Sequence, residues 1–204
     1  MSVVAAKALT SEINRAFPVQ NKIQYIMEKS HNYFTLFDMP VTFDIDLPEL
    51  TQRYLKLQKA IHPDKFSNAA EQERVFSVQQ TALLNDAYDT LKKPLLRARY
   101  LLELNGVCLN DEKNTIMDSD FLMQQMELRE AIEKAKSGNA DIDVLEETID
   151  HIDDLYNAKL QIMKKLFAVP EPVFEHIADV ARKLQFFSKL REEADSLAAK
   201  LADH

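Results

Sequence analysis

Glycine scarcity limits what this chain can fold into. Only Gly106 and Gly138 are glycine, whereas about 7% of an average protein is glycine. Tight β-hairpin turns and phosphate-binding loops both require glycine. The sequence therefore predicts an all-α protein that has no glycine-rich nucleotide-binding loop.

Charge and cysteine content exclude several function classes. The net charge is −8, so the chain has no bulk attraction for nucleic acid. Cys108 is the only cysteine, which excludes an internal disulfide and a thiolate-ligated cluster. The five histidines, at 31, 62, 151, 176 and 204, lack metal-ligand spacing. We expect no metal, no cofactor, no enzymatic active site and no nucleic-acid partner.

The N-terminal segment 1–30 is expected to be an extension with weak helical character. Its apolar start is interrupted by Glu12 and Arg15, which argues against a secretory signal. A mitochondrial presequence is the less favoured alternative, because Glu12 comes early. No apolar run approaches the roughly 20 residues that span a bilayer, so no membrane partner is expected.

A strongly amphipathic helix is predicted after Asp46. Asp46 is a good N-cap, and Glu49 follows three residues later as in a capping box. Apolar residues then recur at helical spacing; they are Leu47, Leu50, Tyr54, Leu57 and Ile61. Pro63 ends this helix, because proline lacks an N–H and restricts the residue before it.

Further helices are predicted on both sides of this one. Asn32 can cap a short helix at 33–37, and helices are expected at about 70–92 and 94–104, the latter ending at Asn105-Gly106. Three longer helices follow: one from Asp118 or Ser119 to near Gly138, one at about 141–168 and one at about 173–201. Their short connections predict an antiparallel three-helix bundle.

The tripeptide His62-Pro63-Asp64 lies between two predicted amphipathic helices. The preceding helix carries basic residues on its polar side, and one more follows the tripeptide: Arg53, Lys56, Lys59 and Lys65. One interpretation is that Pro63 only stops a helix and that the cations are a solvated face. The other is a docking loop flanked by a basic surface, whose attraction to an acidic partner would weaken with salt.

The layout resembles the J-domain family, in which a helix, His-Pro-Asp and a second helix follow each other. The second helix carries Leu84-Asn85-Asp86-Ala87-Tyr88 and Leu91. The resemblance implies a hairpin that docks on a DnaK-type ATPase chaperone through His62, Pro63 and Asp64, together with the basic residues. The ATPase site would belong to the partner, and Asp64 would bind a partner arginine.

Among J-domain proteins the chain resembles the HscB branch. The matching stretches are YFTLF (33–37), HPDKF (62–66), KKPLLRARYLLELNG (92–106), FLMQQMELRE (121–130) and RKLQFFSKLR (182–191). The resemblance implies a co-chaperone that stimulates a DnaK/HscA-type chaperone and delivers the IscU-type scaffold to it during iron–sulfur cluster assembly. A J-domain protein that serves another client is the alternative.

The same resemblance implies the domain limits and the compartment. Residues 1–30 would be the extension, 31–106 the J-domain and 107–204 the scaffold-binding bundle. The tetracysteine zinc module of animal members is absent, which points to a bacterial-type cytoplasmic protein rather than one of the mitochondrial matrix. Met27 precedes the stretch that resembles the usual start of the family, so whether residues 1–26 are translated stays open.

The predicted helix near residues 121–137 has two apolar sides. Four residues form a core stripe: Phe121, Leu128, Ile132 and Ala135. Leu122, Met123 and Met126 project to nearly the opposite side, beside Glu127 and Glu130. That second patch either packs against the rest of the chain or binds a partner.

The HscB resemblance implies that this second patch binds the scaffold. It assigns six residues to the contact: Leu122, Met123, Met126, Glu127, Glu130 and Phe186 on the last helix. Phe187 fits the core stripe of that helix better than Phe186 does. Lys134 stands where the family pattern has another acid, which puts the acidic end of the contact in doubt.

Overall fold

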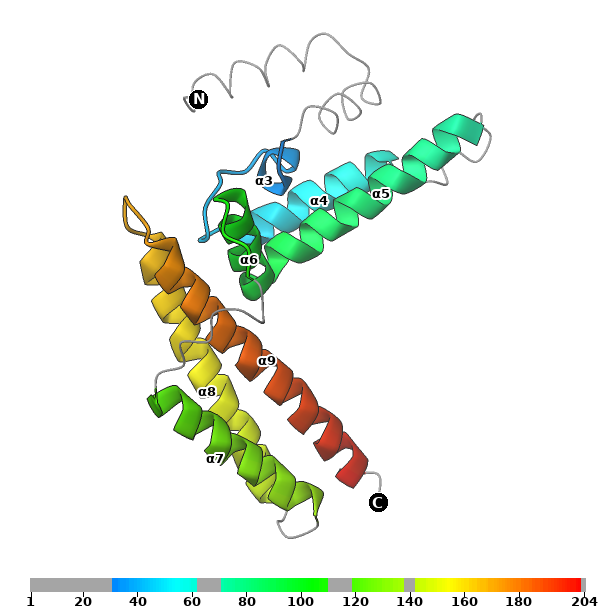
Figure 1. Cartoon of the computed structure of the whole chain (residues 1–204). Helices are drawn as coiled ribbons and strands as arrows, with labels where there is room; N and C mark the ends of the chain where they lie inside the picture. The colour runs from blue at the N-terminus through cyan, green and yellow to red at the C-terminus, as the bar shows by residue number, and fades with distance from the viewer. Residues whose placement is uncertain (1–30, 62–70, 110–118, 138–141, 203–204) are drawn as a thin grey trace. The chain divides into compact units, whose positions relative to one another are not determined.

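The structure is a computed structural model that describes residues 31–61, 71–109, 119–137 and 142–202. Its elements in these ranges are α-helices, which confirms the predicted all-α class (Figure 1). The predicted extension, residues 1–30, lies outside the described residues.

A short helix, α3 (Tyr33–Leu36), opens the described chain. The predicted cap is confirmed, because the Asn32 side chain accepts a hydrogen bond from the Thr35 N–H at 2.9 Å. In return the Asn32 N–H donates to the Thr35 hydroxyl at 3.3 Å. The turn places Phe34 and Phe37 in the core.

Helices α4 (Leu47–Ile61) and α5 (Glu71–Lys92) form the predicted hairpin, and α3 packs against α5 (Figure 1). Asp46 caps α4 by accepting a hydrogen bond from the Glu49 N–H at 2.9 Å. Leu50 and Leu84 are fully buried between the helices. The rings of Tyr54 and Tyr88 stack with centroids 4.1 Å apart.

The predicted apolar stripe on α4 is not buried along its whole length. Leu47, the first residue of the helix, is 41% exposed, whereas Leu50 and Ile61 are buried. Helical spacing determines the side of the helix on which a residue lies, but not how far along that side the burial extends.

Helix α6 (Pro94–Leu104) is followed by the predicted C-terminal signal, Asn105-Gly106. Gly106 has φ +78°, and the Val107 N–H donates to the Leu102 carbonyl at 2.9 Å, which is the Schellman arrangement. Near its start, Arg97 is buried, donates to the Leu91 carbonyl at 2.5 Å and stacks over the Phe43 ring. Burial lowers the pKa of Arg97, against the opposing effect of the nearby Asp44 charge.

The chain divides into two compact units, Met1–Arg97 and Ala98–His204. The division runs through α6, whereas the sequence places the end of the first domain after Gly106. The domain limits stay a prediction. Each unit contains one of the two predicted binding surfaces, so each is described separately below.

The second unit contains the predicted three-helix bundle: α7 (Ser119–Lys136), α8 (Ile142–Phe167) and α9 (Phe174–Ala202) (Figure 1). Its core includes Phe121, Ile132, Leu145, Ile152 and Phe187. Ion pairs add to the packing: Lys136 of α7 bonds Glu193 of α9 at 3.0 Å, and Arg191 of α9 bonds Asp153 of α8 at 2.7 Å. Within the described ranges, none of the helices combines the length and the hydropathy that crossing a bilayer demands.

Candidate functional site

The predicted docking tripeptide lies outside the described residues, as does Lys65. The structure does show how the chain enters that segment. Helix α4 ends at the buried Ile61, whose carbonyl accepts a hydrogen bond from the Ser77 hydroxyl at 2.9 Å. Because Ser77 is itself buried on α5, the residue directly before His62 is fixed to both helices of the hairpin.

The outward face of α4 carries the cations predicted to meet an acidic partner. Lys56 and Lys59 are exposed there, and Leu55, 54% exposed, stands among them. The sequence prediction omitted Leu55. The signal was available, since Leu55 falls roughly 100–180° away from the core residues Leu50 and Ile61 at about 100° per residue.

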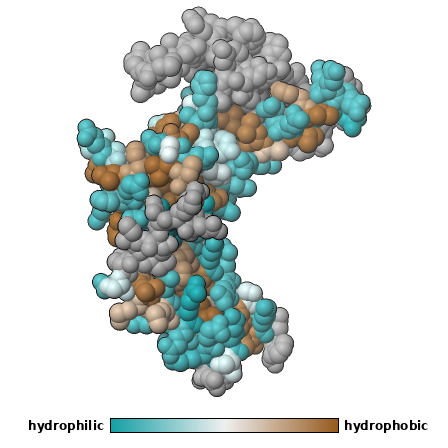
Figure 2. All heavy atoms as spheres, viewed as in Figure 1, coloured by the Kyte–Doolittle hydropathy of each residue, from teal (hydrophilic) through white to brown (hydrophobic). Residues whose placement is uncertain are grey.

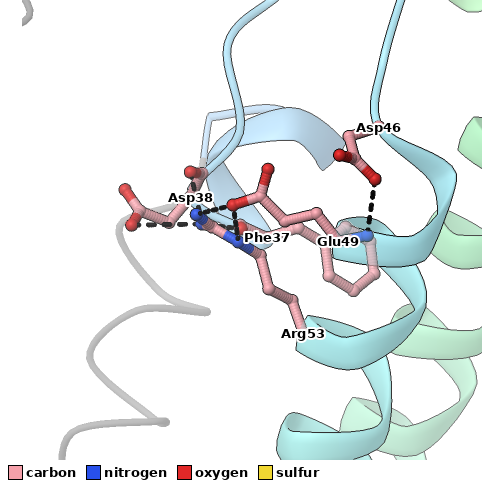
Figure 3. A network of polar contacts seen from close by, with 5 residues as sticks. All are labelled: Phe37, Asp38, Asp46, Glu49 and Arg53. Atoms are coloured by element: carbon pink, nitrogen blue, oxygen red, sulfur yellow. Dashed lines mark hydrogen bonds and ion pairs between the residues drawn. The ribbon is translucent and has the colours of Figure 1, made fainter.

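Arg53, also predicted to meet the partner, is held by contacts within its own unit, and its role in docking stays a prediction. Its guanidinium donates to the Phe37 carbonyl at 2.7 Å and to the Asp38 carbonyl (Figure 3). It also forms ion pairs with Asp38, at 3.2 Å, and with Glu49, at 2.7 Å. The physical reason is that the turn after α3 places two carbonyls and a carboxylate beside this position. Arg53 therefore ties α4 to that turn, and two carboxylates compensate its charge.

We expect Arg53→Ala to lower the melting temperature, because it leaves two backbone carbonyls and two carboxylates without their donor. Hydrogen bonds to charged groups contribute about 1.5–3 kcal/mol, which corresponds to several degrees for a domain of this size. Thermal melting followed by circular dichroism measures the effect. Lys56→Ala, at an exposed position on the same helix, is the control and should leave melting unchanged. Equal melting of the two variants would show that the contacts of Arg53 do not stabilise the fold.

The side of α7 away from the core presents the second predicted surface. Leu122, Met123 and Met126 are 48%, 61% and 65% exposed, whereas Phe121 and Leu128 are buried in the bundle. Brown and tan surface is visible at the first turns of α7 in the space-filling view (Figure 2). A place for these three side chains in the core of the bundle is therefore excluded. We call these three residues, with Glu127 and Glu130, the α7 patch.

Lys134 changes the acidic end of the α7 patch. Its ammonium forms an ion pair with Glu130 one turn earlier, at 2.8 Å. The hydrogen bond from Lys134 and its positive charge lower the pKa of Glu130. Glu127 and Glu130 also line a hollow of about 330 Å³ between α7 and α8, together with Ala131, Lys134 and Val144. Val144 could not be assigned to this surface from the sequence, because its place depends on how α8 packs against α7.

Phe186, predicted to contact the scaffold, packs against side chains of its own unit. Its ring meets Phe121 edge-on at 5.6 Å, and the Arg129 guanidinium lies 5.6 Å from its centroid. The side chain is half-buried, whereas Phe187 is fully buried, as predicted. Phe186 thus supports the start of α7 from α9, and only part of its ring is accessible.

No group of three histidine, cysteine, aspartate or glutamate side chains that could hold an ion occurs in the described ranges. Cys108 is free and exposed in the second unit.

Known proteins resemble the chain over most of its length. Residues 117–195 match the family described as the HSCB C-terminal oligomerisation domain. A co-chaperone protein HscB homolog from Shewanella denitrificans is 45% identical over 177 residues, which cover 84% of this chain and 99% of the relative. The corresponding homolog from Shewanella loihica is 42% identical over 169 residues, covering 80% and 95% of the two chains.

Solved structures give the same result. The chaperone HscB from Vibrio cholerae superposes with a TM-score of 0.71 at 39% identity, covering 83% of this chain and 99% of that one. The human co-chaperone protein HscB superposes with a TM-score of 0.73 at 29% identity, covering 82% of each chain.

Proposed function

The chain belongs to the HscB family of co-chaperones, and from this we propose that it stimulates the ATPase of a DnaK/HscA-type chaperone and delivers an IscU-type scaffold to it during iron–sulfur cluster assembly or transfer. The observation that carries the proposal is the α7 patch, in which three large apolar side chains lie in solvent opposite a well-packed core. An apolar surface of this kind marks a partner site, and methionine suits an adaptable contact.

The first unit is proposed to bind the chaperone through its J-domain hairpin. His62, Pro63 and Asp64 would form the docking loop, with Lys65 beside them. Lys56 and Lys59 would meet acidic chaperone surface, and the salt-bridged Arg53 would hold α4 in position behind them. The catalytic step takes place in the chaperone, so the chain acts as an activator and not as an enzyme.

The second unit is proposed to bind the scaffold. Leu122, Met123 and Met126 would supply the apolar contact, and Glu127 and Glu130 its acidic edge. Phe186 would contribute the accessible part of its ring. We place this activity in the bacterial cytoplasm, in line with the bacterial relatives that the chain resembles over most of its length.

Phosphate release by a purified cognate chaperone tests the proposed function. We expect stimulation by the chain alone, and a larger rate when the chain and the scaffold are both present. An unchanged rate of phosphate release in the presence of the chain would contradict the J-domain role. Stimulation without any effect of the scaffold would favour a co-chaperone that serves a different client.

Chaperone binding is also expected to depend on salt. Screening shortens the reach of a charge from about 10 Å at 0.1 M to about 3 Å at 1 M salt, so the association rate carried by Lys56 and Lys59 should fall steeply over this range. Stopped-flow or surface-based kinetics measures that rate. The double variant Lys56→Ala, Lys59→Ala should associate slowly at low salt and lose most of the dependence. A flat profile for the unmodified chain would make these lysines a solvated surface only.

A further inference from the structure

A hollow of about 330 Å³ adjoins the α7 patch. Its lining joins two helices of one unit, since Glu127, Glu130, Ala131 and Lys134 belong to α7 whereas Val144 belongs to the first turn of α8. Val144 is 44% exposed, and Ile142 at the start of α8 is 38% exposed. Exposed apolar residues therefore also occur at the start of α8, and the two glutamates belong to both the patch and the hollow.

Charge decides what kind of group the hollow favours. Two carboxylates, Glu127 and Glu130, line it against the single ammonium of Lys134. Lys134 is paired with Glu130, whereas Glu127 makes no ion pair with another residue in the described part of the chain. A net negative lining with an unpaired carboxylate attracts a cation and repels an acid.

The ion pair that Lys134 makes is easily replaced. Both side chains are largely exposed, at 61% for Lys134 and 67% for Glu130. Ion pairs in such exposed positions contribute little, because water screens them and two flexible side chains must be held. A cationic group of a partner can therefore replace Lys134 beside Glu130 with little loss of free energy.

We propose that the scaffold-binding surface extends from the α7 patch into this hollow, where the scaffold places an apolar side chain on Ala131 and Val144 beside a basic residue that faces Glu127 and Glu130. Lys134 competes with that basic residue for Glu130 and thereby sets the affinity. The inference rests on the proposed function, because it names a further part of the same contact.

Val144→Ala tests the apolar part of the proposal. Calorimetric titration of the full chain with a purified cognate IscU-type scaffold should show affinity weaker by roughly three- to tenfold, since two methyl groups lose their contact. Val169→Ala is the matched control, because Val169 is 45% exposed in the same unit but away from the hollow. Equal affinities of the two variants would overturn the apolar part.

Lys134→Gln tests the charged part. Removing the competitor should tighten scaffold binding by roughly two- to fivefold at low salt, and the gain should vanish when Glu130→Gln is present as well. Weaker binding of Lys134→Gln would overturn the proposal, because Lys134 would then itself meet a scaffold carboxylate.

Failure of the hollow as a contact and failure of the proposed function give different results. If neither variant changes affinity while the unmodified chain binds the scaffold, the hollow lies outside the contact and the proposed function stands. If the unmodified chain does not bind the scaffold at all, the proposed function fails first.

Discussion

Replacing His62 with glutamine should abolish stimulation of a cognate DnaK/HscA-type chaperone while leaving the helicity of the chain unchanged. The variant should lose the entire increase in ATPase rate that the bound co-chaperone causes. Coupling free energies between sites are typically about 1–3 kcal/mol, which corresponds to a change of roughly 5- to 150-fold. Steady-state phosphate release measures the loss, and circular dichroism checks the fold.

The structure explains why helicity should survive. Residue 62 follows the end of α4, and the hairpin on either side is held by contacts that do not involve it. Leu50 and Leu84 are fully buried, Tyr54 stacks on Tyr88, and Ser77 holds the Ile61 carbonyl. These contacts remain in the variant, so a loss of stimulation would report on docking or on activation.

His31→Gln is the matched control. It makes the same chemical change at an exposed histidine of the same unit, and it should stimulate as the unmodified chain does. A His62→Gln variant that keeps near-normal stimulation would exclude the proposed J-domain mechanism, whatever the relatives of the chain do.

Local sequence signals predicted the helices well. The caps at Asn32 and Asp46 and the glycine end at Gly106 are each satisfied by backbone hydrogen bonds within a few residues. Such short-range geometry is determined by the residues themselves. The angular separation of the two sides of α7 was predicted for the same reason, because it follows from about 100° per residue.

Contacts between distant segments were not predicted. Arg53 has the sequence context of an exposed cation, but the Phe37 and Asp38 carbonyls that it binds lie 16 and 15 residues earlier in the chain. The buried Arg97 depends in the same way on Leu91 and Phe43. Helical periodicity carries no information on the path of a turn. Only the Glu49–Arg53 pair, four residues apart on α4, follows from spacing. The bonds of Arg53 to Phe37 and Asp38 and the hollow at Val144 do not.

The α7 patch allows the two proposed activities to be separated. We expect the triple change Leu122→Ala, Met123→Ala and Met126→Ala to weaken scaffold binding by at least about 2 kcal/mol, more than tenfold, as loss of an interface hot spot does. Stability should fall little, because all three side chains are about half or more exposed. Stimulation of the chaperone without scaffold should survive, since the hairpin is unchanged.

Two further variants calibrate this result. Leu128→Ala removes a side chain that is 4% exposed on the opposite side of α7, and it should lose about 2–5 kcal/mol of stability. The triple change Ile162→Ala, Val169→Ala and Val173→Ala removes exposed apolar side chains of the same unit, 41%, 45% and 54% exposed, and it should alter neither melting nor scaffold affinity.

Thermal melting and calorimetric titration with the scaffold together decide the role of the α7 patch. A large loss of melting temperature in the Leu122, Met123 and Met126 variant would show that the patch supports the fold. Unchanged melting with unchanged affinity would remove these residues from the scaffold contact. The third outcome is unchanged melting with a more than tenfold loss of scaffold affinity. If the Ile162, Val169 and Val173 variant shows no such loss, scaffold binding depends on this patch and not on exposed apolar surface in general. Because the affected binding would lie on the second unit and His62 on the first, the two variants would then lose different partners.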